Sequence, residues 1–193
     1  MKILKMKIGG MDVVMTHTSK ELMRVAKLWK RNAKAMLKRQ GHVATGELFQ
    51  SMHPKLSLDK KGNPQVDLTP DVDYWRFVDS GVKGADSSPF PGQSKSPFGY
   101  STKRPPLSVI QGWMKEKNIK PRDKGTGQFA KGTHKGLAFA IQESIFKRGL
   151  RPSFFISATQ KRIEKKYAVP IALAYTQDLA EALKKEIEDG NND

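Results

Sequence analysis

Residues that could carry catalysis or bind a metal are few and widely separated in this sequence. The chain has no cysteine, which excludes disulfide frameworks, Cys-ligated zinc, iron–sulfur clusters and Cys nucleophiles. Its four histidines are isolated from one another, without the His-x-x-x-His spacing typical of a metal site: His17, His42, His53 and His134. We therefore expect no resident metal and no cofactor.

Two further patterns are similar to active-site motifs without matching them. Asp71, Asp73 and Asp79 could form a divalent-metal nuclease cluster, but they bracket a predicted strand end, where aspartate usually serves as a turn or cap residue. Residues 127–133 have the glycines and lysine of a phosphate-binding loop, but the order Gly-Lys-Ser/Thr is missing and no apolar strand leads into them. The sequence predicts a protein that is not an enzyme, with a nuclease using Asp71 and Asp73 as the weakest alternative.

Positive charge is the strongest chemical signal in the chain. The 193 residues include 35 Lys and Arg against 19 Asp and Glu, for a formal net charge of +16. Residues 1–175 hold 33 bases and 13 acids, whereas residues 176–193 hold 2 bases and 6 acids. A basic body attracts polyanions or acidic partners. The acidic tail either packs onto the body or a neighbouring copy, or serves as a solubilising helix.

A helix predicted over residues 19–40 concentrates the charge. Apolar residues recur at steps of three and four from Leu22 to Leu37, and Thr18 with Glu21 forms a capping-box pattern ahead of them. The polar face carries Glu21 and eight bases: Lys20, Arg24, Lys27, Lys30, Arg31, Lys34, Lys38 and Arg39. Because like charges one turn apart destabilise a helix, a solvated helix usually mixes signs. The bias favours contact with DNA or an acidic partner; a merely solvated face on a basic protein has about equal weight.

The other elements follow from local patterns. Hairpins are predicted for residues 2–15, with the turn at Gly9-Gly10, and for residues 53–69. An aromatic-rich strand is predicted at 72–78, and helices from Leu107 and from Leu137 to Gly149. After Ser157, apolar residues repeat every four positions from Ile163 to Ile187, and Pro170 is expected to kink or break this long helix. No run approaches the roughly 18 apolar residues of a membrane span, so no membrane contact is expected.

Two loop-like segments and the distal helix are candidate contact surfaces. In segment 85–106, Phe90, Phe98 and Tyr100 are apolar anchors that either dock on a neighbour or fold back on their own domain. Segment 119–135 is basic. Leu179, Leu183 and Ile187 are candidate subunit contacts, because so small a protein can hardly bury so long a helical stripe. The candidate contacts with DNA or an acidic partner are Lys27, Lys30, Arg31, Lys34, Lys103, Arg104, Lys120, Arg122, Lys124 and Lys131.

Three short stretches occur in an order that resembles a known protein family. They are Thr45-Gly46-Glu47-Leu48 with Ser51, then Tyr74–Gly81, then Pro152–Ala158. Thr-Gly-x-Leu-x-x-Ser, Tyr-x-x-(Phe/Val)-(Glu/Asp)-x-Gly and Pro-x-Phe-(Phe/Leu)-x-x-Ala stretches recur in this order in the minor tail and tail-completion proteins of long-tailed bacteriophages and prophages. The second stretch of this chain is one residue longer than its pattern, because Val78 stands between Phe77 and Asp79. The resemblance covers about residues 20–162. The chain departs from the family in segments 85–106 and 119–135 and in its acidic C-terminal helix.

The resemblance implies an α+β subunit with a small antiparallel sheet flanked by helices, here with long loops and a long C-terminal helix. Residues 1–157 would form the domain and residues 158–193 a helical extension. The implied role is structural: a homo-oligomeric ring, six-fold or twelve-fold, at the neck or tail top of a virion made in the bacterial host cytoplasm. Its implied partners are the tail terminator or tail tube, the head-completion proteins and, non-specifically, packaged DNA. The alternative is a sequence-independent DNA-binding protein acting outside a particle.

Overall fold

The computed structural model describes residues 2–42, 46–122, 125, 126, 128 and 134–190. The chain divides into two compact units. Unit 1 comprises Met1–Ala35, Ser51–Asp71 and Phe155–Asp193, and unit 2 comprises Met36–Gln50 and Val72–Phe154. Over the described residues the predicted α+β class is confirmed, because helices, one of them long and C-terminal, combine with antiparallel strand pairs. The strands form three two-stranded sheets instead of a single sheet.

Unit 1 begins with a β-hairpin that confirms the first predicted strand pair. Strands β1 (Leu4–Ile8) and β2 (Met11–Met15) are antiparallel, and their register runs from Leu4↔Met15 to Ile8↔Met11. The turn residues Gly9 and Gly10 have φ of 57° and 96°, as a tight two-residue hairpin requires. A second hairpin, β3 (Lys55–Leu58) with β4 (Pro64–Asp67), confirms the other predicted pair.

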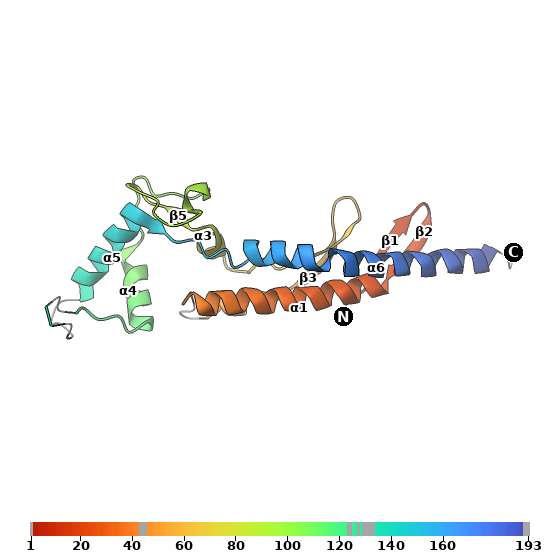
Figure 1. Cartoon of the computed structure of the whole chain (residues 1–193), viewed down its shortest axis with the longest axis horizontal. Helices are drawn as coiled ribbons and strands as arrows, with labels where there is room; N and C mark the ends of the chain where they lie inside the picture. Colours follow the sequence, from red (N-terminus) through yellow and green to blue (C-terminus); the bar gives the residue numbers. More distant parts are fainter. Residues whose placement is uncertain (1, 43–45, 123–124, 127, 129–133, 191–193) are drawn as a thin grey trace. The chain divides into compact units, whose positions relative to one another are not determined.

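Two long helices, α1 (Thr16–Arg39) and α6 (Ser157–Gly190), accompany these hairpins. Figure 1 shows them side by side, and the contacts show that they are antiparallel, because His17 bonds Asp178 whereas Trp29 bonds Thr159. The Trp29 indole donates to the Thr159 hydroxyl at 3.0 Å in the buried interior. The core of this unit joins residues of β1, β2, α1 and β3 with half-buried residues of α6, among them Leu4, Val13, Met15, Leu22, Leu56, Ile171, Tyr175 and Leu179.

Helix α6 runs unbroken through Pro170, so of the kink or break expected there, the break does not occur. Proline removes one backbone hydrogen bond, but packing on both sides can hold the helix together. Ile163 before the proline is buried, and Ile171 and Tyr175 after it pack against the core. Of the helices in the described part of the chain, none is both long and apolar enough to cross a membrane.

Unit 2 contains shorter elements. They are α2 (Glu47–Gln50), α3 (Trp75–Ser80), β5 (Val82–Lys83), the 3₁₀ helix η1 (Gln93–Lys95), α4 (Leu107–Glu116), α5 (His134–Arg148) and β6 (Gly149–Leu150). Strands β5 and β6 pair antiparallel, and α4 and α5 pack through Ile110, Met114 and Ala138. The helices predicted from Leu107 and from Leu137 are thus confirmed. The sequence also predicts a short helical turn over residues 44–52, capped by Thr45. Helix α2 confirms the turn, and Thr45 itself lies outside the described residues.

The strand predicted at 72–78 is wrong, because Trp75–Ser80 form a helix. Trp75 and Val78 are half-buried, whereas Tyr74, Arg76 and Phe77 are exposed. This is the three-residue spacing of a helix, not the alternation of a strand. The aromatic cluster is accordingly split: Phe77 and Tyr74 lie at the surface, and Phe77 contacts Phe98 with ring centroids 4.4 Å apart.

Candidate functional site

Six bases of unit 1 form a stripe along α1, which we call the α1 basic stripe: Lys20, Arg24, Lys27, Lys30, Arg31 and Lys34. At about 100° per residue they fall within an arc of about 120°, opposite the buried Leu22, Val25 and Trp29. From Lys20 to Lys34 the stripe is about 21 Å long, at about 1.5 Å per residue. The amphipathic pattern of the sequence therefore correctly separated the core face of this helix from its charged face.

Charge on this stripe is only weakly compensated by the helix itself. Glu21 is the one acid of α1, and its carboxylate accepts from Arg24 Nε at 2.7 Å. That hydrogen bond lowers the pKa of Glu21 below its usual value. Burial lowers the pKa of Lys34, and the charge of Lys30, one turn away, lowers it further. The two lysines repel each other, and a polyanion lying along the stripe would relieve that repulsion.

The first turns of α6 bring more bases beside α1. The Arg24 guanidinium lies 5.2 Å from the ring centroid of Tyr167, and Lys166 Nζ lies 5.5 Å from the same centroid. Both distances are in the range of a cation–π contact. Lys161, Arg162 and Lys165 are exposed in the same turns of α6. Tyr167 thus joins positive charge from two helices that are more than a hundred residues apart in the sequence, a junction that no spacing rule predicts.

The remaining predicted contact bases belong to unit 2 or lie outside the described residues. Lys103, Lys120 and Arg122 are exposed in unit 2, and Lys124 and Lys131 are not among the described residues. Arg104 is held by its own unit: its Nε donates to Glu143 at 3.0 Å, and its guanidinium lies 4.6 Å from the Phe146 ring centroid. Arg104 and Lys147 both lower the pKa of Glu143. Arg104 is therefore engaged within its own unit, which reduces its availability for a polyanion.

Segment 85–106 folds back on its own unit, which was one of the two alternatives. Phe90, Phe98 and Tyr100 are all half-buried. Phe98 contacts Phe77, Tyr100 lies 6.2 Å from the Phe146 centroid, and the Arg148 guanidinium lies 5.8 Å from the Phe90 centroid. These three anchors each contact unit 2 in the isolated chain, so any role at a subunit interface would use only their exposed parts.

Gln93 holds this segment in place from inside unit 2. Its side chain is fully buried, and its Nε2 donates to the carbonyl oxygens of Val82 (2.6 Å) and Arg148 (2.8 Å). Its Oε1 accepts from the Phe90 N–H at 3.1 Å. Because both the oxygen and the nitrogen of this buried side-chain amide are hydrogen-bonded, they fix the position of the segment against the rest of unit 2. The composition of the segment could not show this, because the partners come from β5 and from the end of α5.

Two of the three stretches that carry the family resemblance meet in unit 2. The Ser153 N–H donates to the Val78 carbonyl at 3.0 Å, and the Phe154 N–H donates to the Asp79 carbonyl at 2.9 Å. Gly81, with φ of 70°, packs so closely that a side chain there would collide with Leu150 and Pro152. The glycine that ends one stretch is therefore required by the backbone that leads into the other.

The predicted contacts on α6 separate into two faces. Leu179 packs against the unit 1 core, whereas Leu183 and Ile187 are exposed. The reason is geometric: a repeat of four residues advances about 400° per step at 3.6 residues per turn, so it drifts by about 40° each time. A stripe that begins on the buried face at Ile163 therefore ends on the exposed face at Ile187.

The start of α1 is capped from α6, not by the predicted capping box at Thr18. The helix begins at Thr16, and the buried Asp178 carboxylate accepts from the N–H groups of His17 and Thr18 at 2.8 Å each. The Thr18 hydroxyl is buried without a hydrogen-bond partner. Because Asp178 supplies the negative group that a helix N-terminus attracts, Thr18 is not needed as a cap.

Asp178 also belongs to a cluster of possible metal ligands. Ligand atoms of His17, Asp178 and Glu181 lie within 4.8 Å of one another, the one such group among the described residues. Both Asp178 oxygens already accept backbone N–H groups, and His17 Nε2 lies 2.9 Å from Glu181 Oε1. The geometry supports capping and a hydrogen bond between side chains. The aspartates considered for a nuclease are not part of this group, and Asp71 instead pairs with Lys55 at 3.2 Å.

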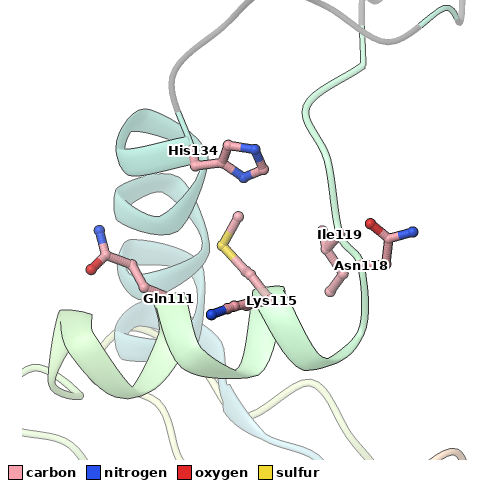
Figure 2. Close-up of a pocket in the computed structure, with 6 residues that line it drawn as sticks. Gln111, Lys115, Asn118, Ile119 and His134 are labelled. Atoms are coloured by element: carbon pink, nitrogen blue, oxygen red, sulfur yellow. The ribbon is translucent and has the colours of Figure 1, made fainter.

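A cavity of about 340 Å³ lies between α4 and α5 in unit 2. Figure 2 shows Gln111 and Lys115 on α4, Asn118 and Ile119 just after it, and His134 at the start of α5. All five of these side chains are exposed or half-buried, so the cavity is open to solvent. We assign no ligand to it.

Comparisons with known proteins identify no relative of this chain. No family model, no curated protein and no solved structure matches the chain.

Proposed function

We propose that this chain is a structural subunit of the neck or tail top of a long-tailed bacteriophage, acting by assembly into a ring and not by catalysis. The observation that carries the proposal is the meeting of the resemblance stretches in unit 2. The backbone of Val78 and Asp79 is hydrogen-bonded to the backbone of Ser153 and Phe154, although some 75 residues separate them. Stretches that resemble one family in order and also pack together are better support than either fact alone.

The α1 basic stripe supports the second part of the proposal, a surface near packaged DNA. Its bases lie on the face opposite the core, and Arg24 and Tyr167 extend the positive charge to α6. Phosphate attraction carries no base information, so a ring around a DNA channel benefits from positive charge without sequence-specific contacts.

The test is assembly and location. Purified full-length protein, measured by mass photometry, is expected to give one discrete species at a multiple of 21.6 kDa. Electron micrographs of phage particles labelled on this protein are expected to place it at the junction of head and tail. Absence of the protein from purified particles would overturn the proposal.

The α1 basic stripe also favours a second candidate, a sequence-independent DNA-binding protein acting alone. In that case the isolated monomer would bind duplex DNA, with a log–log salt slope of about −0.9 per phosphate contacted. Lys27→Glu with Arg31→Glu should then weaken binding strongly. Lys60→Glu with Lys61→Glu, on the exposed turn between β3 and β4, is the matched control because it changes the net charge equally. Equal losses in both double variants would argue against a specific role for the stripe.

A further inference from the structure

The exposed face of α6 carries a second, mainly apolar row, which we call the outer seam. Its members are Val169, Leu173, Thr176, Ala180, Leu183 and Ile187. Their steps alternate between four residues and three, which is the heptad spacing of a coiled-coil seam. At about 100° per residue they lie within an arc of about 80°. Residues that pack against the unit 1 core, such as Ile171, Tyr175 and Leu179, occupy the other side of the helix.

The seam is exposed although its chemistry suits burial. The relative exposures of its large members are 68% for Val169, 66% for Leu173, 50% for Leu183 and 64% for Ile187. The Thr176 hydroxyl already donates to the Ala172 carbonyl at 3.0 Å, so this side chain can be buried without an unsatisfied polar group. From Val169 to Ile187 the seam extends about 27 Å along the helix, at about 1.5 Å per residue. Four large apolar side chains exposed along one such row are typical of an interaction surface.

We propose that the outer seam pairs with the outer seam of a second copy of this chain, in antiparallel orientation. A strict 3.5-residue period specifies another helix as the occupant, because it keeps the seam facing a supercoiled partner. The described length of α6 (Figure 1) supplies that helix already folded, so little ordering entropy opposes the pairing.

The charges along α6 select the second copy and its direction. Residues 157–167 hold four bases and one acid, whereas residues 181–190 hold four acids and two bases. In an antiparallel pair the basic start of each helix lies beside the acidic end of the other. In a parallel pair the like-charged ends would meet and repel. One helix thus carries both halves of a complementary charge pattern.

The spacing also sets the register of the pair. Centring the two helices on residue 178 places Val169 opposite Ile187 of the second copy and Leu173 opposite its Leu183. Thr176 and Ala180 then meet in the middle, where small side chains allow close approach. Such a contact is two-fold symmetric, so it is not the repeated head-to-tail contact that closes a ring. It goes beyond the proposed function, because it joins two copies before assembly or links two rings.

The absence of cysteine from the chain makes cross-linking a direct test. Val169→Cys protein is mixed with Ile187→Cys protein and treated with a short bis-maleimide. The mixture is expected to give a cross-linked dimer, whereas each single variant alone gives at least tenfold less, because its own cysteines would lie about 27 Å apart. Equal self-cross-linking of the single variants would show parallel pairing and overturn the proposal.

A second measurement tests the seam without cysteines. Leu173→Glu with Leu183→Glu is expected to raise the dissociation constant of the pair at least tenfold in sedimentation equilibrium, with the helical circular dichroism retained. Val109→Glu with Phe139→Glu, at similarly exposed apolar positions on α4 and α5, is the control matched in charge and should leave the constant unchanged. A monomeric wild-type protein at all concentrations would overturn the pairing. Failure of ring assembly or absence from particles would refute the proposed function and leave the cross-linking result standing.

Discussion

Asp178 is expected to be the most important single polar side chain for the stability of unit 1. It is 1% exposed, and each of its carboxylate oxygens accepts a backbone N–H at the start of α1. Asp178→Ala leaves the N–H groups of His17 and Thr18 without a partner in a buried region. Hydrogen bonds to a charged group contribute about 1.5–3 kcal/mol each. The variant no longer has to bury a charged carboxylate, and this gain offsets part of the loss. The free energy of unfolding should fall by about 2–3 kcal/mol.

The assay must report on unit 1 alone. Trp29 is buried in this unit, whereas Trp75 and Trp113 belong to unit 2. In a background carrying Trp75→Phe and Trp113→Phe, tryptophan fluorescence therefore follows unit 1 during urea unfolding. With a slope of about 2 kcal/mol per M, the expected loss lowers the urea midpoint by about 1–1.5 M.

Two further variants separate capping from the neighbouring side-chain contact. Asp178→Asn keeps one acceptor oxygen and should lower the free energy of unfolding by about 1–2 kcal/mol. Glu181→Gln alters only the exposed hydrogen bond to His17 and should cost less than about 0.5 kcal/mol. A midpoint for Asp178→Ala within about 0.2 M of the parent would refute the reasoning, since at that slope the carboxylate would contribute almost nothing.

The remaining predictions concern unit 2. Gln93→Leu should lower the free energy of unfolding of unit 2 by about 2–4 kcal/mol, because the buried Val82 carbonyl and the partly buried Arg148 carbonyl lose their donor. Ser94→Ala, at the exposed neighbouring position, is the control, and equal urea midpoints for the two variants would contradict this prediction. Gly149→Ala should lower the free energy of unfolding by at least about 2 kcal/mol, because φ is 77° there and the new methyl group collides with β5. Gly112→Ala, where the new methyl group meets open space on α4, should instead raise the free energy of unfolding by up to about 1 kcal/mol. Arg104→Gln should raise the pKa of Glu143 toward its usual value in a carboxyl NMR titration. Because the pKa of Glu143 is lowered in the fold, its ion pair with Arg104 stabilises the folded state above about pH 4.3, and this stabilisation is lost as the pH falls. An unchanged pKa of Glu143 in the variant would show that Arg104 does not hold this carboxylate.

Local signals in the sequence were sufficient for much of the secondary structure. Gly9-Gly10 predicted the first hairpin, because few residues other than glycine adopt positive φ twice in succession. The period of apolar residues predicted α1 and separated its buried face from its basic stripe. These features depend on residues within a few positions of each other, so the sequence alone determines them.

Only the tertiary structure decided how those elements are completed. The cap of α1 is Asp178, which lies about 160 residues away, so no local motif could identify it and the pattern at Thr18 was misleading. Residues 75–80 form a helix, which places Trp75 and Val78 on one half-buried side, and the aromatic composition of this segment did not predict it. Helix α6 shows both what the sequence determines and what the tertiary packing determines. Its sequence determined that it is long and carries apolar side chains at regular steps. Packing against β2 and α1 decided which of its two rows is buried and left the heptad row at the surface.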